Sequence, residues 1–250
     1  MHCFVCVDDT DMPGTAGTGR LLQKICGELE QEGMGMCSPI SRHQLFVHED
    51  IPFTSHNSAM CVEVQLAETI SLPPFTAWMA ERLEILSQEG SDPGLCVAAS
   101  MGTESQKQLI AFGQKAKKAV LNKDEALELA RDLDIHLSEH GGTGQGVIGA
   151  LAGLGLRLSG NDGRYRGWCH LGGMEDVFQV GDLCRLPFID RVVTLSGAVL
   201  MPDERVRIGS EKTKTVRLGH GQVVVAVPDK GGKQPDVLYR TFTKEEARQY

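Results

Sequence analysis

Cys3-Phe4-Val5-Cys6-Val7-Asp8-Asp9-Thr10-Asp11 is the stretch that decides the fold, because a short apolar run is followed at once by three carboxylates. The apolar part predicts a buried strand that delivers a loop at its carboxyl end. Behind the loop, apolar residues recur at helical spacing from Gly19 to Glu32, and Gly33 is a typical helix stop. The chain therefore opens as strand, loop and helix, and ligands often bind at such a strand end.

The rest of the first half mixes strands and helices. Cys61 to Leu66 predicts a half-buried strand and Leu95 to Ala99 a buried one. Helices are expected from Pro73 to Gln88, from Ser105 to Val120, after a cap at Asp124, and from Val147 to Leu158.

After the turn Asn161-Asp162-Gly163 the chain becomes rich in strands. Those expected are Tyr165 to Leu171, Arg191 to Leu200, Arg205 to Ile208, Val223 to Val227 and Val237 to Thr241. This shift predicts an α/β (α+β) protein of two domains, residues 1–138 and residues 139–250.

The composition is that of an ordinary globular protein. Of 250 residues, 41% are hydrophobic and 23% are charged, which excludes a disordered chain. Lys and Arg number 25 against 33 Asp and Glu, and the net charge of −8 argues against a basic face for duplex nucleic acid. No leader and no apolar run of about 20 residues is seen, so no membrane is expected and the cytoplasm is the default.

Cysteines and histidines often bind metals, but their positions in this sequence favour structural roles. The eight cysteines lie in apolar segments and are expected to be free thiols. Cys3 and Cys6 are three apart in a strand-like run, so their side chains should point to opposite faces. His43, His48 and His56, with Glu49 and Asp50, could imitate a transition-metal site, but the spacings fit no zinc pattern.

The three carboxylates Asp8, Asp9 and Asp11 repel one another at a strand end unless a cation neutralises them. Mg²⁺ fits this role, because it takes oxygen ligands and is usually shared between one or two carboxylates and substrate phosphates. The alternative is a solvated acidic turn in which one Asp caps the loop.

Two glycine-rich loops, each followed by a helix, are candidate phosphate sites, because a helix start offers unpaired N–H groups and a positive dipole. The first loop gives Thr10, Gly14, Thr15, Gly17 and Thr18 as nucleotide-binding candidates. The second gives Gly142, Thr143, Gly144 and Gly146, and a plain connecting loop is the equal alternative there. Neither has the Lys-Ser/Thr ending of a P-loop.

His56 and Asn57 complete the candidate site. His56 could act as a general base, since an unperturbed histidine titrates near neutral pH, and Asn57 could contact a polar ligand. The alternative is a surface turn. The lysines at 115, 117 and 118 are read as a solvated helix face.

Five short motifs follow one another along the chain, and their order is informative. They are Val7-Asp8-Asp9-Thr10-Asp11, Ile51-Pro52-Phe53-Thr54-Ser55-His56-Asn57, Asp92-Pro93-Gly94, Gly144-Gln145-Gly146-Val147-Ile148-Gly149-Ala150-Leu151-Ala152, and the pair Val224-Val225-Ala226-Val227-Pro228 and Pro235-Asp236-Val237-Leu238-Tyr239. In this order they resemble motifs of archaeal tRNA-isoleucine agmatinylcytidine synthetase, an ATP-dependent tRNA-modifying enzyme. The resemblance covers nearly the whole chain.

The resemblance implies a kinase-like domain that binds ATP and Mg²⁺, followed by a ferredoxin-like domain. It also gives the metal role to Asp8, Asp9 and Asp11. In that family the first domain phosphorylates a cytosine carbonyl, and agmatine then displaces the phosphate. The family continues into an oligonucleotide-binding barrel and a zinc ribbon that grip tRNA, and neither is expected here.

The chain departs from the family where phosphate would be held, because Thr54 and His56 replace a Lys and an Arg. ATP is therefore expected to be held mainly by backbone and metal. The leading hypothesis is an ATP- and Mg²⁺-dependent transferase or ligase acting on a small molecule or nucleoside. A non-catalytic nucleotide-binding regulator and a tRNA-modifying subunit with a separate RNA-binding partner are the alternatives. Direct tRNA binding without such a partner is not expected, and a homodimer is left open.

Overall fold

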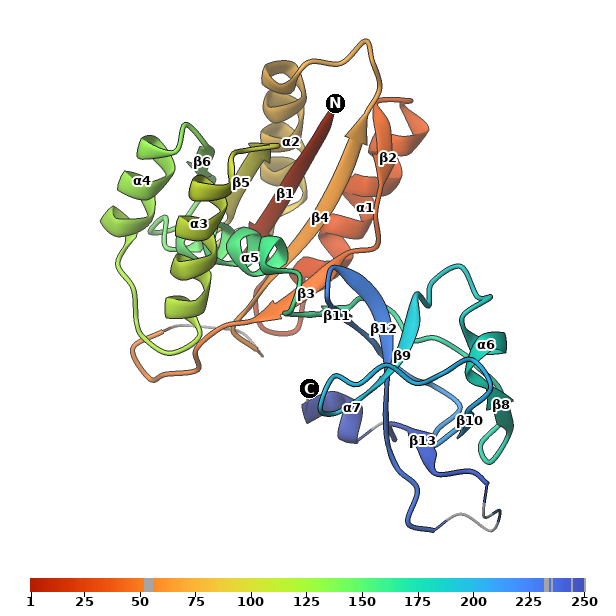
Figure 1. Ribbon diagram of the computed structural model, residues 1–250. Coiled ribbons are helices and arrows are strands. Elements are labelled where there is room, and N and C mark those ends of the chain that lie inside the picture. The colour runs from red at the N-terminus through yellow and green to blue at the C-terminus, as the bar shows by residue number, and fades with distance from the viewer. Residues whose placement is uncertain (52–55, 232–233, 235, 244, 250) are drawn as a thin grey trace. The chain divides into compact units, whose positions relative to one another are not determined.

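The computed structural model describes residues 1–51, 56–231, 234, 236–243 and 245–249, and it divides into two compact units, Met1–Ser159 and Gly160–Tyr250. The mixed α/β class expected from the sequence is confirmed (Figure 1). Two motif segments, residues 52–55 and residue 235, lie outside the described residues. No helix in the described part of the chain is long and apolar enough to cross a membrane.

The first unit is built on an antiparallel sheet whose central strand is β1 (His2–Asp8). β1 pairs with β4 (Ser58–Leu66) on one side and with β5 (Gly94–Ala99) on the other. The edges are β6 (His136–Glu139) beside β5, and β2 (Gly35–Cys37) and β3 (Ser41–Gln44), which both pair with β4.

Helices cover both faces of this sheet (Figure 1). One face packs against α1 (Thr18–Gln31) and α2 (Leu72–Leu86). The other packs against α3 (Thr103–Ala116), α4 (Lys123–Asp132) and α5 (Gly146–Ser159).

The side chains of β1 alternate between the two helical layers. Cys3, Val5 and Val7 are buried in the cluster with α1 and α2, whereas Cys6 is buried in the cluster with α5. Cys3 and Cys6 therefore face opposite sides of the sheet, as expected, and all eight cysteines are free. Asp8 follows Cys6 at a spacing of two, which directs its carboxylate toward α5.

The boundary between the units is Gly160, rather than residue 138 as the composition shift suggested. The reason is that β6 pairs with β5 and α5 packs in the core of the first sheet, so both belong to the first unit. The sequence reading also did not identify β6, because its residues His-Leu-Ser-Glu are largely polar. The cap of α4 differs as well: Asn122, not Asp124, accepts the backbone N–H of Glu125 at 2.8 Å.

The second unit is mainly β. Its strands are β7 (Arg164–Tyr165), β8 (Val177–Gln179), β9 (Arg191–Thr194), β10 (Arg205–Arg207), β11 (Thr215–Leu218), β12 (Gly221–Pro228) and β13 (Tyr239–Thr241). They pair in the order β7-β11-β12-β13-β10-β8, with β9 parallel to β12. The helices described here, α6 (Val180–Leu183) and α7 (Glu246–Gln249), have four residues each. The ferredoxin-like label for this unit stays a prediction.

Arg157 is a buried charge that ties the last turn of α5 to the β4 side of the sheet. Its side chain is 2% exposed and donates to Glu63 Oε1 at 2.9 Å, Ser38 Oγ at 3.0 Å and the Pro39 carbonyl at 3.3 Å. A buried guanidinium is tolerated only with such a set of acceptors, since an unpaired charge there would be very costly.

We expect Arg157→Ala to lower the free energy of unfolding by about 3–5 kcal/mol, because it removes the cation from a buried pair and leaves a cavity. Urea unfolding measures this. The control is Lys107→Ala, which breaks an exposed pair with Glu104 and should cost less than about 1 kcal/mol. Equal losses in the two variants would contradict this role for Arg157.

Candidate functional site

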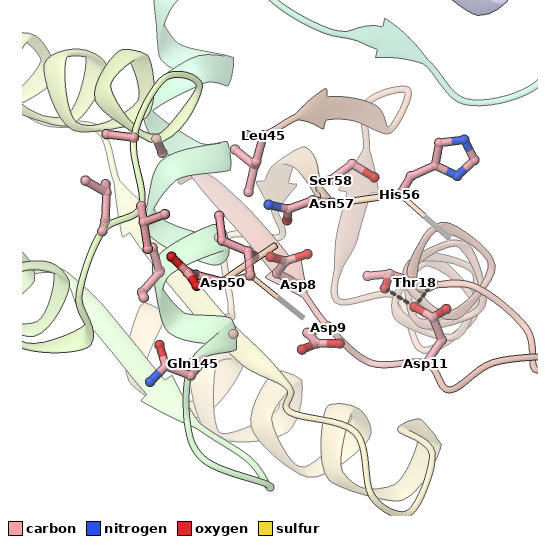
Figure 2. A pocket seen from close by; sticks show the side chains of 18 residues that line it. Asp8, Asp9, Asp11, Thr18, Leu45, Asp50, His56, Asn57, Ser58 and Gln145 are labelled. Atoms are coloured by element: carbon pink, nitrogen blue, oxygen red, sulfur yellow. Dashed lines mark hydrogen bonds between the residues drawn. The ribbon is translucent and has the colours of Figure 1, made fainter. Parts of the chain in front are cut away.

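A pocket of about 320 Å³ opens in the first unit where β1 ends (Figure 2). One part of its wall is acidic and is formed by Asp8, Asp9, Asp11 and Asp50. Another part is apolar and is formed by Leu45, Ile51, Ala116, Ala119, Val120, Leu121 and Ile148. Among the described lining residues there is no Lys or Arg. The pocket therefore offers negative charge beside a surface for an apolar group.

Asp9 allows two successive carboxylates to reach the same pocket. Its φ of 51° is in the left-handed region, which costs energy for a residue other than glycine and is tolerated best by Asp and Asn. The backbone is held there because Asp92 N–H donates to the Asp9 carbonyl at 3.0 Å, and Gln88 N–H donates to the Thr10 carbonyl at 3.1 Å. The turn interrupts the strand alternation that would otherwise separate Asp8 from Asp9.

The Asp8 carboxylate lies against the backbone of α5 at Gly149, where a Cβ would overlap it. Burial raises the pKa of Asp8 from 3.8 to about 8, and the charges of Asp9 and Asp11 add to this. Burial likewise raises the pKa of Asp9 to about 6, helped by Asp92 and Asp11. Both carboxyl groups are thus poised to gain from a bound cation.

Asp11 caps helix α1. Its Oδ1 accepts the Thr18 hydroxyl at 2.9 Å and the Thr18 backbone N–H at 3.3 Å (Figure 2). This is the capping role that the sequence left open as an alternative. Asp11 lines the pocket, but its carboxylate also satisfies the helix start that was expected to receive a phosphate.

Most of the first glycine loop lies away from the pocket. Gly14, Thr15 and Gly17 are exposed and do not line it, and the Thr15 hydroxyl donates to the Met12 carbonyl at 2.8 Å. Thr10 is fully buried, and its hydroxyl oxygen is among the described buried polar atoms without a hydrogen-bond partner. Of the candidates in this loop, only Thr18 reaches the pocket.

The second glycine loop binds a carboxylate of the protein itself. Asp92 accepts the Thr143 hydroxyl at 2.5 Å, Gly144 N–H at 2.5 Å and Gln145 N–H at 3.1 Å. The donors of the loop before α5 therefore bind Asp92 rather than a ligand, and Gly142, Thr143 and Gly144 do not line the pocket. Gly146 does line it and packs closely against Gly94.

His56 and Asn57 line the pocket, as the sequence suggested. Asn57 is fixed by donating its side-chain N–H to the Phe46 carbonyl at 2.6 Å. His43, in contrast, is fully buried and pairs with the Ser41 hydroxyl at 2.7 Å, so it takes no part in the pocket.

Sequence patterns did not predict the pocket's apolar wall, and they named Asp50 only as part of a candidate transition-metal site, whereas it lines the pocket. The wall comes from Leu45 and Ile51, from Ile148 of α5, and from the end of α3 and the segment after it, which contribute Ala116, Ala119, Val120 and Leu121. Leu45 and the residues at the end of α3 belong to no motif, and periodicity alone predicts core or loop there. Ile51 and Ile148 lie in motif segments, but their motifs do not indicate an apolar wall.

The residues fit a shared Mg²⁺ site rather than a closed metal cage. Among the described residues, no three His, Cys, Asp or Glu side chains are grouped closely enough to hold a metal ion by themselves. Asp8 and Asp9 can supply one or two carboxylates, which is what Mg²⁺ takes from a protein when phosphates and water complete its shell. The metal role therefore stays a prediction. Its predicted ligands are now Asp8 and Asp9, because the Asp11 carboxylate accepts the Thr18 hydroxyl.

The raised pKa of Asp8 predicts how stability depends on pH. Between pH 3.8 and about 8 the folded state holds a proton that the unfolded chain releases, so the free energy of unfolding falls as pH rises through this window. Asp8→Asn should flatten much of this slope and stabilise the ligand-free protein at pH 8 by on the order of 2 kcal/mol. Urea unfolding from pH 5 to 8 measures it, and the exposed Asp203→Asn should keep the wild-type slope. A steeper slope in Asp8→Asn would refute the assignment.

No family model matches the sequence. An uncharacterised protein of Methanocaldococcus jannaschii is 29% identical over 151 residues, which is 60% of this chain and 48% of that protein. The crystal structure of apo TiaS, an isoleucine-tRNA agmatidine synthetase, is similar with a TM-score of 0.53 and 26% identity, over 62% of this chain and 35% of that chain. The complex of TiaS with its tRNA and ATP has the same fold at TM-score 0.53 and 23% identity, over 80% of this chain and 48% of that one.

The chain thus spans about half or less of the length of these relatives. The resemblance that the ordered motifs carry is confirmed: the chain is similar to the tRNA agmatidine synthetase TiaS in sequence and in fold.

Proposed function

We propose that this chain is an ATP-dependent, ligase-like enzyme that binds a magnesium nucleotide in the pocket of its first unit. The observation that carries the proposal is the pair of carboxylates, Asp8 and Asp9, turned into one cavity with raised pKa values and an apolar wall. A magnesium nucleotide matches both features, since its metal takes carboxylate ligands and the faces of its aromatic base can pack against an apolar wall. The similar TiaS complex contains ATP, which supports the choice of nucleotide.

In this proposal Asp8 and Asp9 hold the metal, which when bound supplies positive charge to the phosphates of the nucleotide. The apolar wall around Ile51 and Leu121 receives the base, and Asn57 contacts polar groups of the ligand. His56, at the edge of the pocket, removes a proton from the acceptor as general base. The acceptor is a small molecule or a nucleoside.

A non-catalytic regulator is the second candidate, and the absence of Lys and Arg from the described lining residues favours it. Catalysis of phosphoryl transfer usually uses such cations to stabilise the transferred group. Release of phosphate or pyrophosphate from ATP separates the two functions, because a regulator binds the nucleotide without turnover.

A role on tRNA is the third candidate. The expectation that this chain needs a separate partner to bind tRNA is not supported, since the similar TiaS structure is a tRNA complex. Residues 160–250 also carry more Lys and Arg than Asp and Glu, although the whole chain has a net charge of −8. Any contact with the phosphate backbone would then fall on the second unit, and it should weaken steeply with salt.

The Asp9→Asn variant tests the metal role. Titration calorimetry with ATP should show binding that requires Mg²⁺ in the wild type and an affinity at least about 10-fold lower in the variant, because a metal ligand is lost. The melting temperature should change little. Asp203→Asn, at an exposed position, is the matched control. Equal affinity in Asp9→Asn and wild type would remove the basis of the proposal.

The Gly149→Ala variant tests whether Asp8 must lie against α5. The added Cβ would overlap the Asp8 carboxylate, so nucleotide affinity in Mg²⁺ should fall by about 10-fold or more through displacement of that ligand. Gly27→Ala is the control, because a Cβ in that helix meets nothing within 4 Å and should stabilise the protein by about 0.5–1 kcal/mol. Calorimetry and urea unfolding of both variants give the comparison, and unchanged binding in Gly149→Ala would contradict the geometry.

A further inference from the structure

A second group of reactive side chains lies outside the pocket, on β6, on the residue that follows it and on α2 of the first unit. His140 Nε2 is 2.7 Å from Ser138 Oγ, and His140 Nδ1 is 2.9 Å from Glu84 Oε1. A further histidine, His136, brings its Nε2 within 2.9 Å of the same serine oxygen. We propose that Ser138, His140 and Glu84 form a second reactive centre, in which Ser138 is the nucleophile toward small activated carboxylic esters.

The proton positions in this group follow from its chemistry. An ionised Glu84 carboxylate can only accept, so His140 Nδ1 must donate the proton in that contact. The neutral imidazole then has an unprotonated Nε2, which accepts the Ser138 hydroxyl. This is the tautomer that a serine nucleophile needs from its base. Ser138 Oγ in turn accepts from His136 Nε2–H.

Burial differs among the three members, and Glu84 is the exposed one, with 62% of its side chain accessible. The His140 side chain is only 6% exposed, so the base is held in one orientation and away from water. Ser138 is half-buried on the edge strand of the sheet, where a small ester can reach it. Burial and the nearby His140 lower the pKa of His136, which keeps a second positive charge away from the base.

The sheet edge also provides a donor for the developing oxyanion. The backbone N–H of His140 donates to the Pro93 carbonyl at 2.9 Å, so this N–H group points toward β5. Successive residues of a strand direct their N–H groups to opposite sides, so Glu139 N–H faces the open edge. Glu139 directly follows Ser138, and the residue after the nucleophile is a position from which oxyanion donors come.

The reaction balances with water as the second substrate. Ser138 Oγ bonds to the ester carbonyl carbon while His140 Nε2 takes the hydroxyl proton. The bond from that carbon to the leaving oxygen then breaks, and the alcohol departs with the proton from His140. Water next attacks the acyl carbon, passes a proton through His140 to Ser138 Oγ, and releases the carboxylic acid.

The test treats the full chain with a fluorophosphonate probe and with p-nitrophenyl acetate. One covalent adduct is expected, mapped to Ser138 by peptide mass spectrometry, and Ser138→Ala should abolish it. His140→Ala should slow labelling at least about 100-fold, because the base is lost. Ser196→Ala is the control, since that exposed hydroxyl pairs with Thr194 rather than with a histidine.

Glu84 is a positioning residue, so its test separates the rate of labelling from the affinity for the probe. Glu84→Gln should slow labelling of Ser138 while the probe concentration that gives half the maximal rate stays the same, because the amide can no longer hold His140 in the tautomer that accepts the serine proton, and Glu84→Asp should restore part of the rate. Magnesium nucleotide binding and the melting temperature should be unchanged in Ser138→Ala, which separates this centre from the pocket. Labelling at another residue, or equal labelling of Ser138→Ala and wild type, would overturn the proposal.

Discussion

Two adjacent carboxylates held in a partly apolar cavity are the constraint around which the first unit is organised. Asp8 reaches the cavity because strand alternation directs it toward α5, and it fits only because residue 149 lacks a side chain. Asp9 reaches it through a left-handed backbone conformation, which the N–H group of Asp92 holds in place. Burial raises the pKa of both groups, so the free site is destabilised in a way that a bound cation would relieve.

Two of the protein's own carboxylates bind backbone donors near this site. Asp11 caps α1 through Thr18, and Asp92 accepts two N–H groups and a hydroxyl in the loop before α5. A free phosphate would meet no Lys or Arg among the described lining residues. The arrangement favours an anion that arrives with its own metal, and this is why we prefer a magnesium nucleotide to a bare anion as the ligand.

The Ser138 centre and the pocket differ in how their polar side chains are arranged. The side chains of the Ser138 centre are linked one to the next by hydrogen bonds at a sheet edge, and the series ends on one carboxylate. In the pocket, several carboxylates line one cavity. The two share the first unit, and they are linked along the chain because the segment from β6 continues directly into the loop that binds Asp92. Their chemistries do not depend on each other, so loss of one centre should leave the other intact.

The sequence by itself determined the opening strand, loop and helix, the opposite faces of Cys3 and Cys6, the family resemblance and the choice of His56 and Asn57 as candidate site residues. These features depend on local periodicity and on short motifs, which are properties of neighbouring residues. The tertiary structure alone decided that Asp92 occupies the second glycine loop and that the Asp11 carboxylate, which lines the pocket, also caps α1. It also decided that Ala116, Ala119, Val120 and Leu121 contribute to the apolar wall. It also moved the unit boundary to Gly160, because β6 and α5 join the first sheet through pairing and burial between distant residues, and no local pattern encodes such contacts.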